Sequence, residues 1–306
     1  MNYDTAIKKS WSYILKYRFL WGLGVLAALT EGASGANFYS YSSADTPQID
    51  QAKATEVARK TLDWISNHAT FVITALIILF ILSLISLFVS YCARAGLIFS
   101  IDKLESGGKI NFTQAFKAGI KYFWRSLGLA FVYTFSILFC LVALMLLIFA
   151  IVMLAVGITP WLLIILIPIG IVALVGFIAL LIYFNFILLF SLREIVIKNT
   201  GILKAIDNSC KLIRKKLGAI IISWLINLAL GVAASMVVAI FALVIGGLLA
   251  LIGVGIYFSL GVVATFVYAI PITLIFIAAL ILLSGIINAY FSTYWTLIYR
   301  QISDKT

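Results

Sequence analysis

Four apolar stretches of this chain contain no charged residue, and their lengths decide what the sequence can fold into. The stretches are residues 19–30, 64–93, 126–192 and 217–299. Because an α-helix needs about 20 apolar residues to cross the hydrocarbon core of a bilayer, the second stretch is long enough for one crossing and the last two for two crossings each. The composition agrees, since 64% of the residues are hydrophobic and only 11% are charged, whereas a soluble domain has about 25% charged residues. A soluble globular protein is therefore excluded.

Helix-breaking residues divide the two long stretches. Gly157 and Pro160 interrupt one of them, and a cluster of glycines that ends at Gly261 interrupts the other, because glycine and proline weaken or end helices. The first stretch becomes long enough only if it extends through the small residues up to Ala36. We therefore predict an all-α, polytopic membrane protein that forms a single domain over residues 1–306, with six transmembrane helices paired as three hairpins. The spans are expected at about residues 18–38, 68–93, 127–156, 161–192, 218–251 and 260–299.

Lys and Arg are distributed unevenly between the segments that connect these spans. Of the 22 Lys and Arg, all but Lys53, Arg59 and Lys60 fall on one side of the predicted membrane. Since basic residues concentrate in cytoplasmic loops, we expect a multi-pass protein of the cell membrane, with both termini in the cytoplasm and residues 31–67 outside. The basic start of the chain and the small residues after the first span also resemble a secretory signal, so cleavage of that span is the alternative.

The segments that precede the first, third and fifth spans resemble one another. Residues 112–128 and 202–218 carry the same residue at four equivalent positions, and residues 6–18 resemble them more weakly. Each segment places apolar and basic residues on different helical faces, as helices in a membrane interface do. We expect three copies of one unit, each an interfacial helix, a span outward and a span back, although any hairpin with basic flanks would look similar. The cytoplasmic interfacial helices are expected at residues 3–17, 111–125 and 201–216.

Three sequence patterns resemble a family of six-span membrane proteins. They are SWSYILKYRFLWGLG at 10–24, AIDNSCKLIRKK at 205–216 and FSTYWTLIYR at 291–300. This largely uncharacterised family includes the membrane domain that is attached to some glycerophosphodiester phosphodiesterases. The resemblance implies the same helical membrane fold and a role in contact with lipid. It does not imply catalysis, because no positions here correspond to the phosphodiesterase barrel.

The residues that enzymes and metal sites require are sparse in this sequence. His68 is the one histidine, whereas a zinc site takes three or four ligands, and Cys92, Cys140 and Cys210 show no disulfide pattern. All 11 Asp and Glu lie outside the uncharged stretches, although ion-coupled transporters usually keep an ionisable group within the membrane. We therefore predict neither an enzyme nor a metal- or cofactor-binding protein. The basic residues are dispersed between long uncharged stretches, which argues against a nucleic-acid partner.

Arginines close the second, fourth and sixth predicted spans at equivalent places. Arg94, Arg193 and Arg300 can reach headgroup phosphates from there. Lys121 and Lys211 occupy the same position in two of the predicted interfacial helices. These five residues are our candidate contacts with lipid headgroups. The arginines either act as separate anchors or form a ring around one anionic headgroup.

Asparagines are the most polar residues within the last three predicted spans. Asn185, Asn227 and Asn288 either hold neighbouring helices together by hydrogen bonds or line a cavity. Small residues also recur at every fourth position from Gly231 to Ala239. Because small residues let helix backbones approach closely, this pattern predicts a tightly packed face on the fifth span.

Two functions fit these features. The leading one is a non-enzymatic integral membrane protein that organises or senses lipids, or scaffolds a protein partner, through its basic cytoplasmic segments. Its expected partners are anionic lipid headgroups, which attract each basic residue by about 1 kcal/mol near the surface, and an unidentified membrane protein. The alternative is a transporter or exporter subunit for an apolar or lipid-like substrate, with the three asparagines along the pathway.

Overall fold

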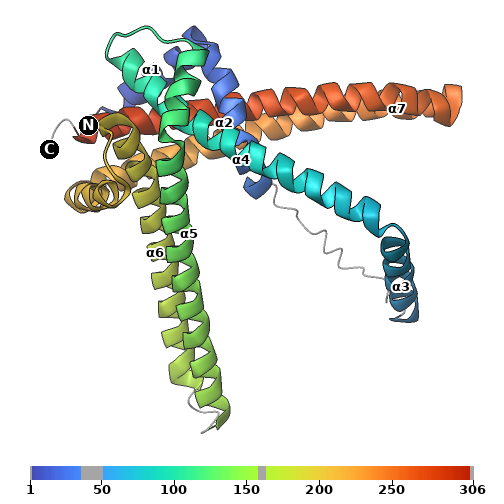
Figure 1. The fold of residues 1–306 in the computed structure, drawn as a ribbon, viewed down its shortest axis with the longest axis horizontal. Coiled ribbons are helices and arrows are strands. Elements are labelled where there is room, and N and C mark those ends of the chain that lie inside the picture. The colour runs from blue at the N-terminus through green and yellow to red at the C-terminus, as the bar shows by residue number, and fades with distance from the viewer. Residues whose placement is uncertain (1, 36–50, 158–162, 304–306) are drawn as a thin grey trace.

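All regular structure in the described part of the chain is α-helical, as the sequence predicts. The computed structural model describes residues 2–35, 51–157 and 163–303. The helices in Figure 1 are α1 (Tyr3–Lys16), α2 (Phe19–Gly35), α3 (Gln51–Asn67), α4 (Ala69–Glu105), α5 (Phe112–Gly157), α6 (Leu163–Lys198) and α7 (Ile202–Ser303).

The long helix α7 consists of two runs that reverse direction at Gly261. This residue has a φ angle of 82°, a conformation that glycine adopts without steric cost. The two runs lie side by side (Figure 1). Between them, the Tyr268 hydroxyl donates a hydrogen bond to the Leu249 carbonyl at 3.3 Å, and the rings of Phe241 and Phe276 stack with centroids 6.2 Å apart. The glycine cluster in the sequence thus marks a true reversal of the chain.

Within the described residues, five helices are long and apolar enough to cross a membrane. They are Ala69–Glu105, Phe112–Met153, Pro168–Lys198, Ile202–Ser259 and Gly261–Ser303. The predicted first span, 18–38, corresponds to α2, whose described apolar part, Phe19–Ala28, is shorter than a bilayer crossing. Residues 36–38 of that prediction, and residues 36–50 of the predicted external segment, lie outside the described residues.

Of the three predicted interfacial helices, only the first is a separate helix, α1. The segments at 111–125 and 201–216 are the first parts of α5 and α7. In α7 the segment ends at Lys216, whose backbone angles are not helical, so the chain changes direction before the apolar run begins.

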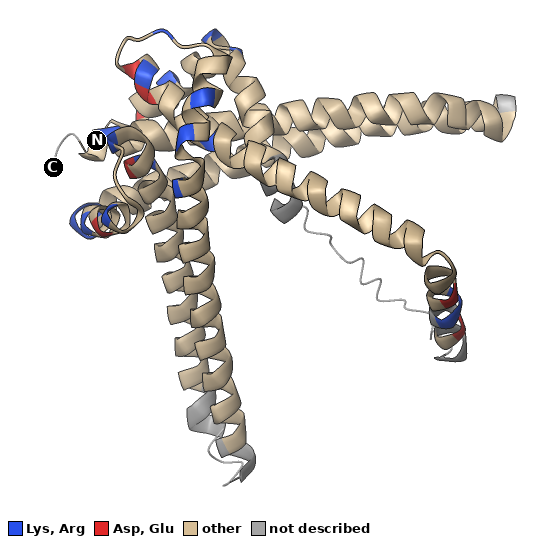
Figure 2. Ribbon diagram, in the orientation of Figure 1, with Lys and Arg blue, Asp and Glu red and all other residues tan. Residues whose placement is uncertain are grey.

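Three arms diverge from a common base that we call the hub (Figure 1). The hub contains residues 3–28, 90–129, 186–224 and 285–303, and its fully buried side chains include Leu97, Phe190 and Tyr294. The arms are the first part of α4, the paired α5 and α6, and the paired runs of α7. Lys, Arg, Asp and Glu gather in the hub and on α3, whereas the arms carry none (Figure 2).

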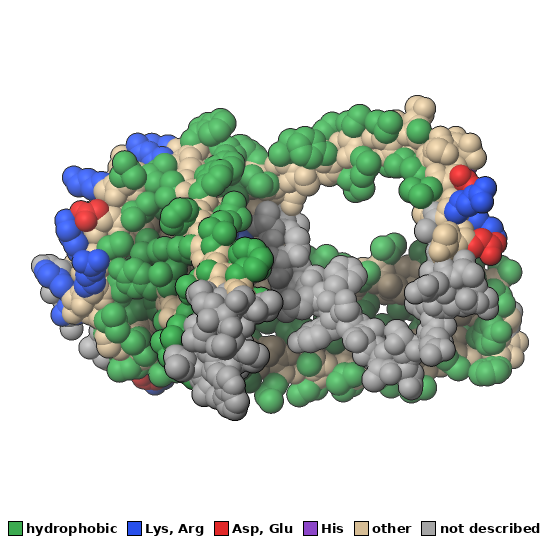
Figure 3. All heavy atoms as spheres, turned by 90° about the horizontal axis from the view of Figure 1, so that it is seen from below, with side chains coloured by type: hydrophobic (Ala, Val, Ile, Leu, Met, Phe, Trp, Pro, Cys, Tyr) green, Lys and Arg blue, Asp and Glu red, His purple; other side chains and the backbone are tan. Residues whose placement is uncertain are grey.

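Apolar side chains cover the surface of the arms (Figure 3). Phe139 and Phe258 are 76% and 82% exposed. Such extended apolar surface is unfavourable in water and marks contact with a membrane or another apolar phase. The surface of the arms therefore suits an apolar environment, whereas the charged hub suits a polar one.

Glycine allows the helices of the hub to cross at very short distances. A Cβ atom on Gly119 of α5 would lie 1.9 Å from the Cys92 carbonyl oxygen of α4, and one on Gly24 of α2 would lie 2.1 Å from the Gly285 oxygen of α7. Both distances are far below van der Waals contact, so only glycine fits there. These crossings bring α5 close to α4 and α2 close to α7 within the hub.

Polar contacts fasten α1 to the hub. Lys9 forms an ion pair with Glu105 at 2.7 Å, and the Tyr13 hydroxyl donates a hydrogen bond to the same carboxylate at 2.5 Å. Burial and this hydrogen bond raise the pKa of Tyr13 above its ordinary value. Helix α1 is therefore held by the hub as well as by its own amphipathic pattern.

Candidate functional site

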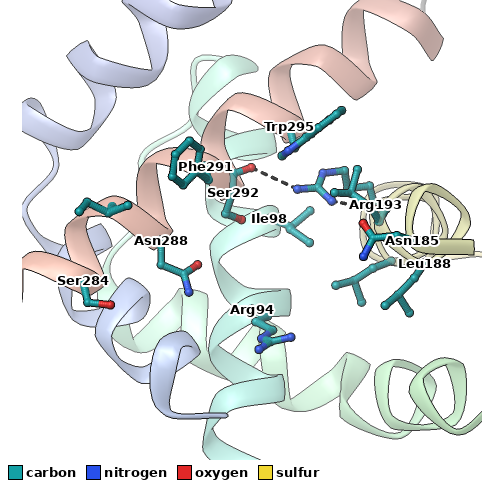
Figure 4. A pocket seen from close by; sticks show the side chains of 13 residues that line it. Arg94, Ile98, Asn185, Leu188, Arg193, Ser284, Asn288, Phe291, Ser292 and Trp295 are labelled. Carbon is teal, nitrogen blue, oxygen red and sulfur yellow. Dashed lines mark hydrogen bonds between the residues drawn. The ribbon is translucent and has the colours of Figure 1, made fainter. Parts of the chain in front are cut away.

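A cavity lies in the hub where α4, α6 and the end of α7 meet (Figure 4). Its volume is about 440 Å³, which is within the range of small-molecule pockets. Apolar side chains such as Leu188, Ile287 and Trp295 form much of its wall. The polar side chains that line it are Arg94, Asn185, Arg193, Ser284, Asn288 and Ser292.

Arg193 is the most deeply buried charged group of this cavity, with 5% of the residue exposed. Its Nη1 donates a hydrogen bond to the Leu189 carbonyl, one turn earlier on α6, at 2.6 Å. Its Nη2 donates to the Ser292 carbonyl of α7 at 3.4 Å, the contact drawn toward Ser292 in Figure 4. The Nε atom has no hydrogen-bond partner among the described residues. The guanidinium is thus fixed by neutral carbonyls, and its Nε donor is unused.

Arg94 reaches the cavity from α4. Its Nε donates a hydrogen bond to the Ala27 carbonyl of α2 at 3.4 Å, and its guanidinium lies 5.8 Å from the centroid of the Tyr91 ring. Ser90 also donates to the Ala27 carbonyl, at 2.8 Å. These contacts with α2 hold the α4 side of the cavity in place.

The described lining of the cavity contains two arginines and no carboxylate. Glu194 follows Arg193 directly, but successive residues of a helix face different directions. Its carboxylate accepts hydrogen bonds from the Tyr299 hydroxyl and from Asn208 Nδ2, and it lies 3.3 Å from Lys198 Nζ. The nearest acid in the sequence therefore belongs to a separate buried cluster.

Asn185 and Asn288 both line the cavity, whereas Asn227 is absent from its described lining. The Oδ1 atom of Asn227 is buried and has no hydrogen-bond partner among the described residues. The three asparagines that the sequence groups together thus separate into two that share a site and one that lies elsewhere.

The other candidate headgroup contacts lie outside this cavity. Arg300 forms an ion pair with Asp102 of α4 at 3.1 Å and also donates a hydrogen bond to the Asp102 carbonyl. Lys211 pairs with Asp207 at 2.5 Å, and the exposed Lys121 lies 5.7 Å from the Tyr122 ring centroid. Of the three arginines considered for a ring, Arg94 and Arg193 line the same cavity, whereas Arg300 does not.

Some residues at this end of the hub could not be identified as candidates from the sequence. Trp295 and Ser292 of the cavity, and Tyr299 beside Glu194, carry no spacing signal of their own. Tyr299 lies 105 residues after its partner, so only the packing of α7 against α6 reveals the pair. The aromatic residues of the closing segment, 291–300, are the one feature of the sequence that points to these contacts.

The described residues contain no group of three or more potential metal ligands. His68 is exposed, its Nδ1 lies 2.9 Å from the Trp64 carbonyl, and its ring stacks on that of Trp64. Cys92, Cys140 and Cys210 are free cysteines. What the cavity offers chemically is hydrogen-bond donation and positive charge.

Five membrane-length apolar helices, together with a hub that holds the charges, define a multi-pass α-helical membrane protein. The chain belongs to the family described as "Family of unknown function (DUF7544)", which matches residues 2–305. No curated protein and no solved structure matches the chain. The resemblance to the membrane domain of some glycerophosphodiester phosphodiesterases stays a prediction.

Proposed function

We propose that this protein organises anionic lipids around its hub, as a non-enzymatic, six-span protein of the cell membrane. In this proposal the three arms cross the bilayer, α2 adds the first span as the partner of the α4 arm, and the rest of the hub with both termini lies at the cytoplasmic surface. The single observation that carries the proposal is the separation of charge in Figure 2, where the hub is basic and the arms are uncharged.

The physical argument is electrostatic attraction at the membrane surface. Exposed basic side chains such as Lys117, Lys121 and Lys215 precede the apolar arms of α5 and α7 in the chain. Each basic group near a membrane surface attracts anionic headgroups by about 1 kcal/mol, within about one Debye length. Anionic lipids should therefore gather next to the hub more than in the bulk bilayer, and salt should weaken the effect.

The test measures the lipids that surround the protein. The full chain is reconstituted into vesicles that contain anionic and zwitterionic lipids, extracted with a lipid-retaining polymer at several salt concentrations, and the co-extracted lipids are quantified. We expect enrichment in anionic lipid that falls as salt rises and that is reduced by Lys117→Gln with Lys121→Gln. The matched control, Arg59→Gln with Lys60→Gln on α3, removes two charges away from the hub. A lipid composition equal to the bulk, or equal losses in both double variants, would contradict the proposal.

A transporter or exporter subunit for a lipid-like substrate is the second candidate. The observation that favours it is that Asn185 and Asn288 line one cavity between different arms. Substituting either residue by leucine should abolish movement of a fluorescent lipid between the leaflets of reconstituted vesicles, without lowering the thermal midpoint. Unchanged lipid movement in both variants would remove this candidate.

A further inference from the structure

The buried charge of Arg193 calls for an anion. Arg193 is 5% exposed and its hydrogen-bond acceptors are two neutral carbonyls. A buried charge is strongly unfavourable unless an opposite charge accompanies it. The described lining adds a second arginine, Arg94, and no carboxylate. Arg193 is therefore a buried charge whose described contacts include no opposite charge.

The available donors suit a phosphate group. A guanidinium presents its N–H donors in a planar fork that matches phosphate oxygens, and such charged hydrogen bonds are stronger than neutral ones. The Nε of Arg193 is an unused donor among the described contacts. Asn185 and Ser284 add neutral groups that can donate to the remaining oxygens.

The surroundings of the cavity favour a phosphate that carries acyl chains. Ser284 and Asn185 lie where the hub meets the apolar arms of α7 and α6 (Figure 4). Just beyond them, Ile281 and Ile178 are about half exposed. A phosphate bound between the arginines would thus have acyl chains along apolar helices. A headgroup with its own cation would be disfavoured, because both charged groups of the cavity are positive.

We propose that the cavity between α4, α6 and α7 binds one anionic phospholipid by its phosphate, held between Arg94 and Arg193. This inference rests on the proposed function, since it assigns one specific lipid site within a hub that attracts anionic lipids in general. Arg193 anchors the phosphate from α6, and Arg94 supplies the second charge from α4. The lipid thereby joins helices of all three arms.

The experiment uses the full chain in detergent, freed of lipid, and native mass spectrometry with added lipid. The probes are phosphatidylglycerol, phosphatidylcholine and inorganic phosphate. We expect one tightly bound phosphatidylglycerol per chain and weaker binding of phosphatidylcholine. The mass of the adduct separates a phospholipid from inorganic phosphate. If millimolar inorganic phosphate displaces the lipid completely, the site belongs to the free anion and the lipid assignment is overturned.

Variants of the cavity decide the location of the site. Arg94→Gln removes one charge, and Ser284→Leu fills the cavity while leaving both arginines intact. Each should weaken phosphatidylglycerol binding by about tenfold or more, as expected for loss of a charged hydrogen bond or of the space itself. Arg193→Lys keeps the charge but loses the fork, and should weaken binding as well. The matched control Arg214→Gln removes an exposed hub charge and should change binding less than about twofold.

The outcomes separate this inference from the proposed function. If Arg94→Gln and Ser284→Leu bind phosphatidylglycerol within twofold of the unsubstituted chain, the cavity is not the site and the inference fails. The enrichment of anionic lipid around the hub, measured as above on the same variants, would then still stand. If that enrichment is absent while one lipid per chain remains sensitive to Arg94→Gln, the general proposal fails and the cavity site survives.

Discussion

Gly119→Ala should be among the most damaging small substitutions in this protein. The new Cβ atom would lie 1.9 Å from the Cys92 carbonyl oxygen and 2.7 Å from its carbon. Ordinary contact begins at about 3.4 Å, so α4 and α5 would have to separate by roughly 1.5 Å at their crossing. The clashing atoms belong to the backbone, which cannot turn aside as a side chain does.

The magnitude follows from two opposing effects. Overpacking a closely packed site destabilises by about 1–3 kcal/mol and occasionally more. Alanine in place of glycine recovers about 1 kcal/mol of helix propensity. Because the clash with the backbone lies at the severe end of that range, we expect a net loss of about 2 kcal/mol, or roughly 4–8 °C in the thermal midpoint.

The control is Gly218→Ala, the same change at a helical position where a Cβ would meet no atom within 4 Å. It should leave the thermal midpoint in detergent unchanged or raise it, since only the helix propensity changes. A second measurement reports on the crossing itself. In a background with Cys140 and Cys210 replaced by serine, Gly119→Ala should speed maleimide labelling of the buried Cys92. A midpoint for Gly119→Ala equal to that of Gly218→Ala, with slow labelling of Cys92, would refute this reasoning.

Three further predictions concern buried polar groups. Glu194→Gln should lower the thermal midpoint, with a loss of about 1–3 kcal/mol, because the buried carboxylate accepts hydrogen bonds from Tyr299 and Asn208; an unchanged midpoint would contradict it. Burial and the hydrogen bond to Glu105 raise the pKa of Tyr13 above 10.0. The protonated Tyr13 hydroxyl therefore contributes its full stability below pH 10. This stability is lost as the pH rises further, because the unfolded chain releases the Tyr13 proton before the folded chain does. Tyr13→Phe should therefore flatten the decline of the midpoint above pH 10, and an equally steep decline would count against it. Asn227→Leu should raise the midpoint, by about 1 kcal/mol, because it removes a buried oxygen without a partner among the described residues; a clear loss of stability would show that this asparagine has a partner.

The patterns within single helices were predictable from the sequence. The three longer uncharged stretches contain the arms, because an unpaired charge is too unfavourable in lipid to persist within a long helix. The glycine cluster correctly marked the reversal of α7 at Gly261. The amphipathic start of the chain correctly indicated a helix, and α1 extends over Tyr3–Lys16. In each case the cause is local, so neighbouring residues suffice to identify it.

Close packing between helices was harder to locate. The small residues from Gly231 to Ala239 predicted a tightly packed face, but Ser235 and Ala239 are exposed in the structure. The closest approaches occur instead at Gly24 and Gly119, which belong to no repeating pattern. A crossing needs only one residue without a side chain, and its position depends on the angle between two helices that are distant in the sequence.

The sequence by itself determined that this is an all-α chain with long apolar helices and a separate set of charged segments. These properties follow from composition and from periodicity within each helix. Only the tertiary structure decided that Arg94, Arg193 and Asn288 share one cavity, while Arg300 pairs with Asp102 and Asn227 lies elsewhere. Equivalent positions in repeated segments need not meet in space, because the packing of helices that are distant in the sequence selects which side chains come together.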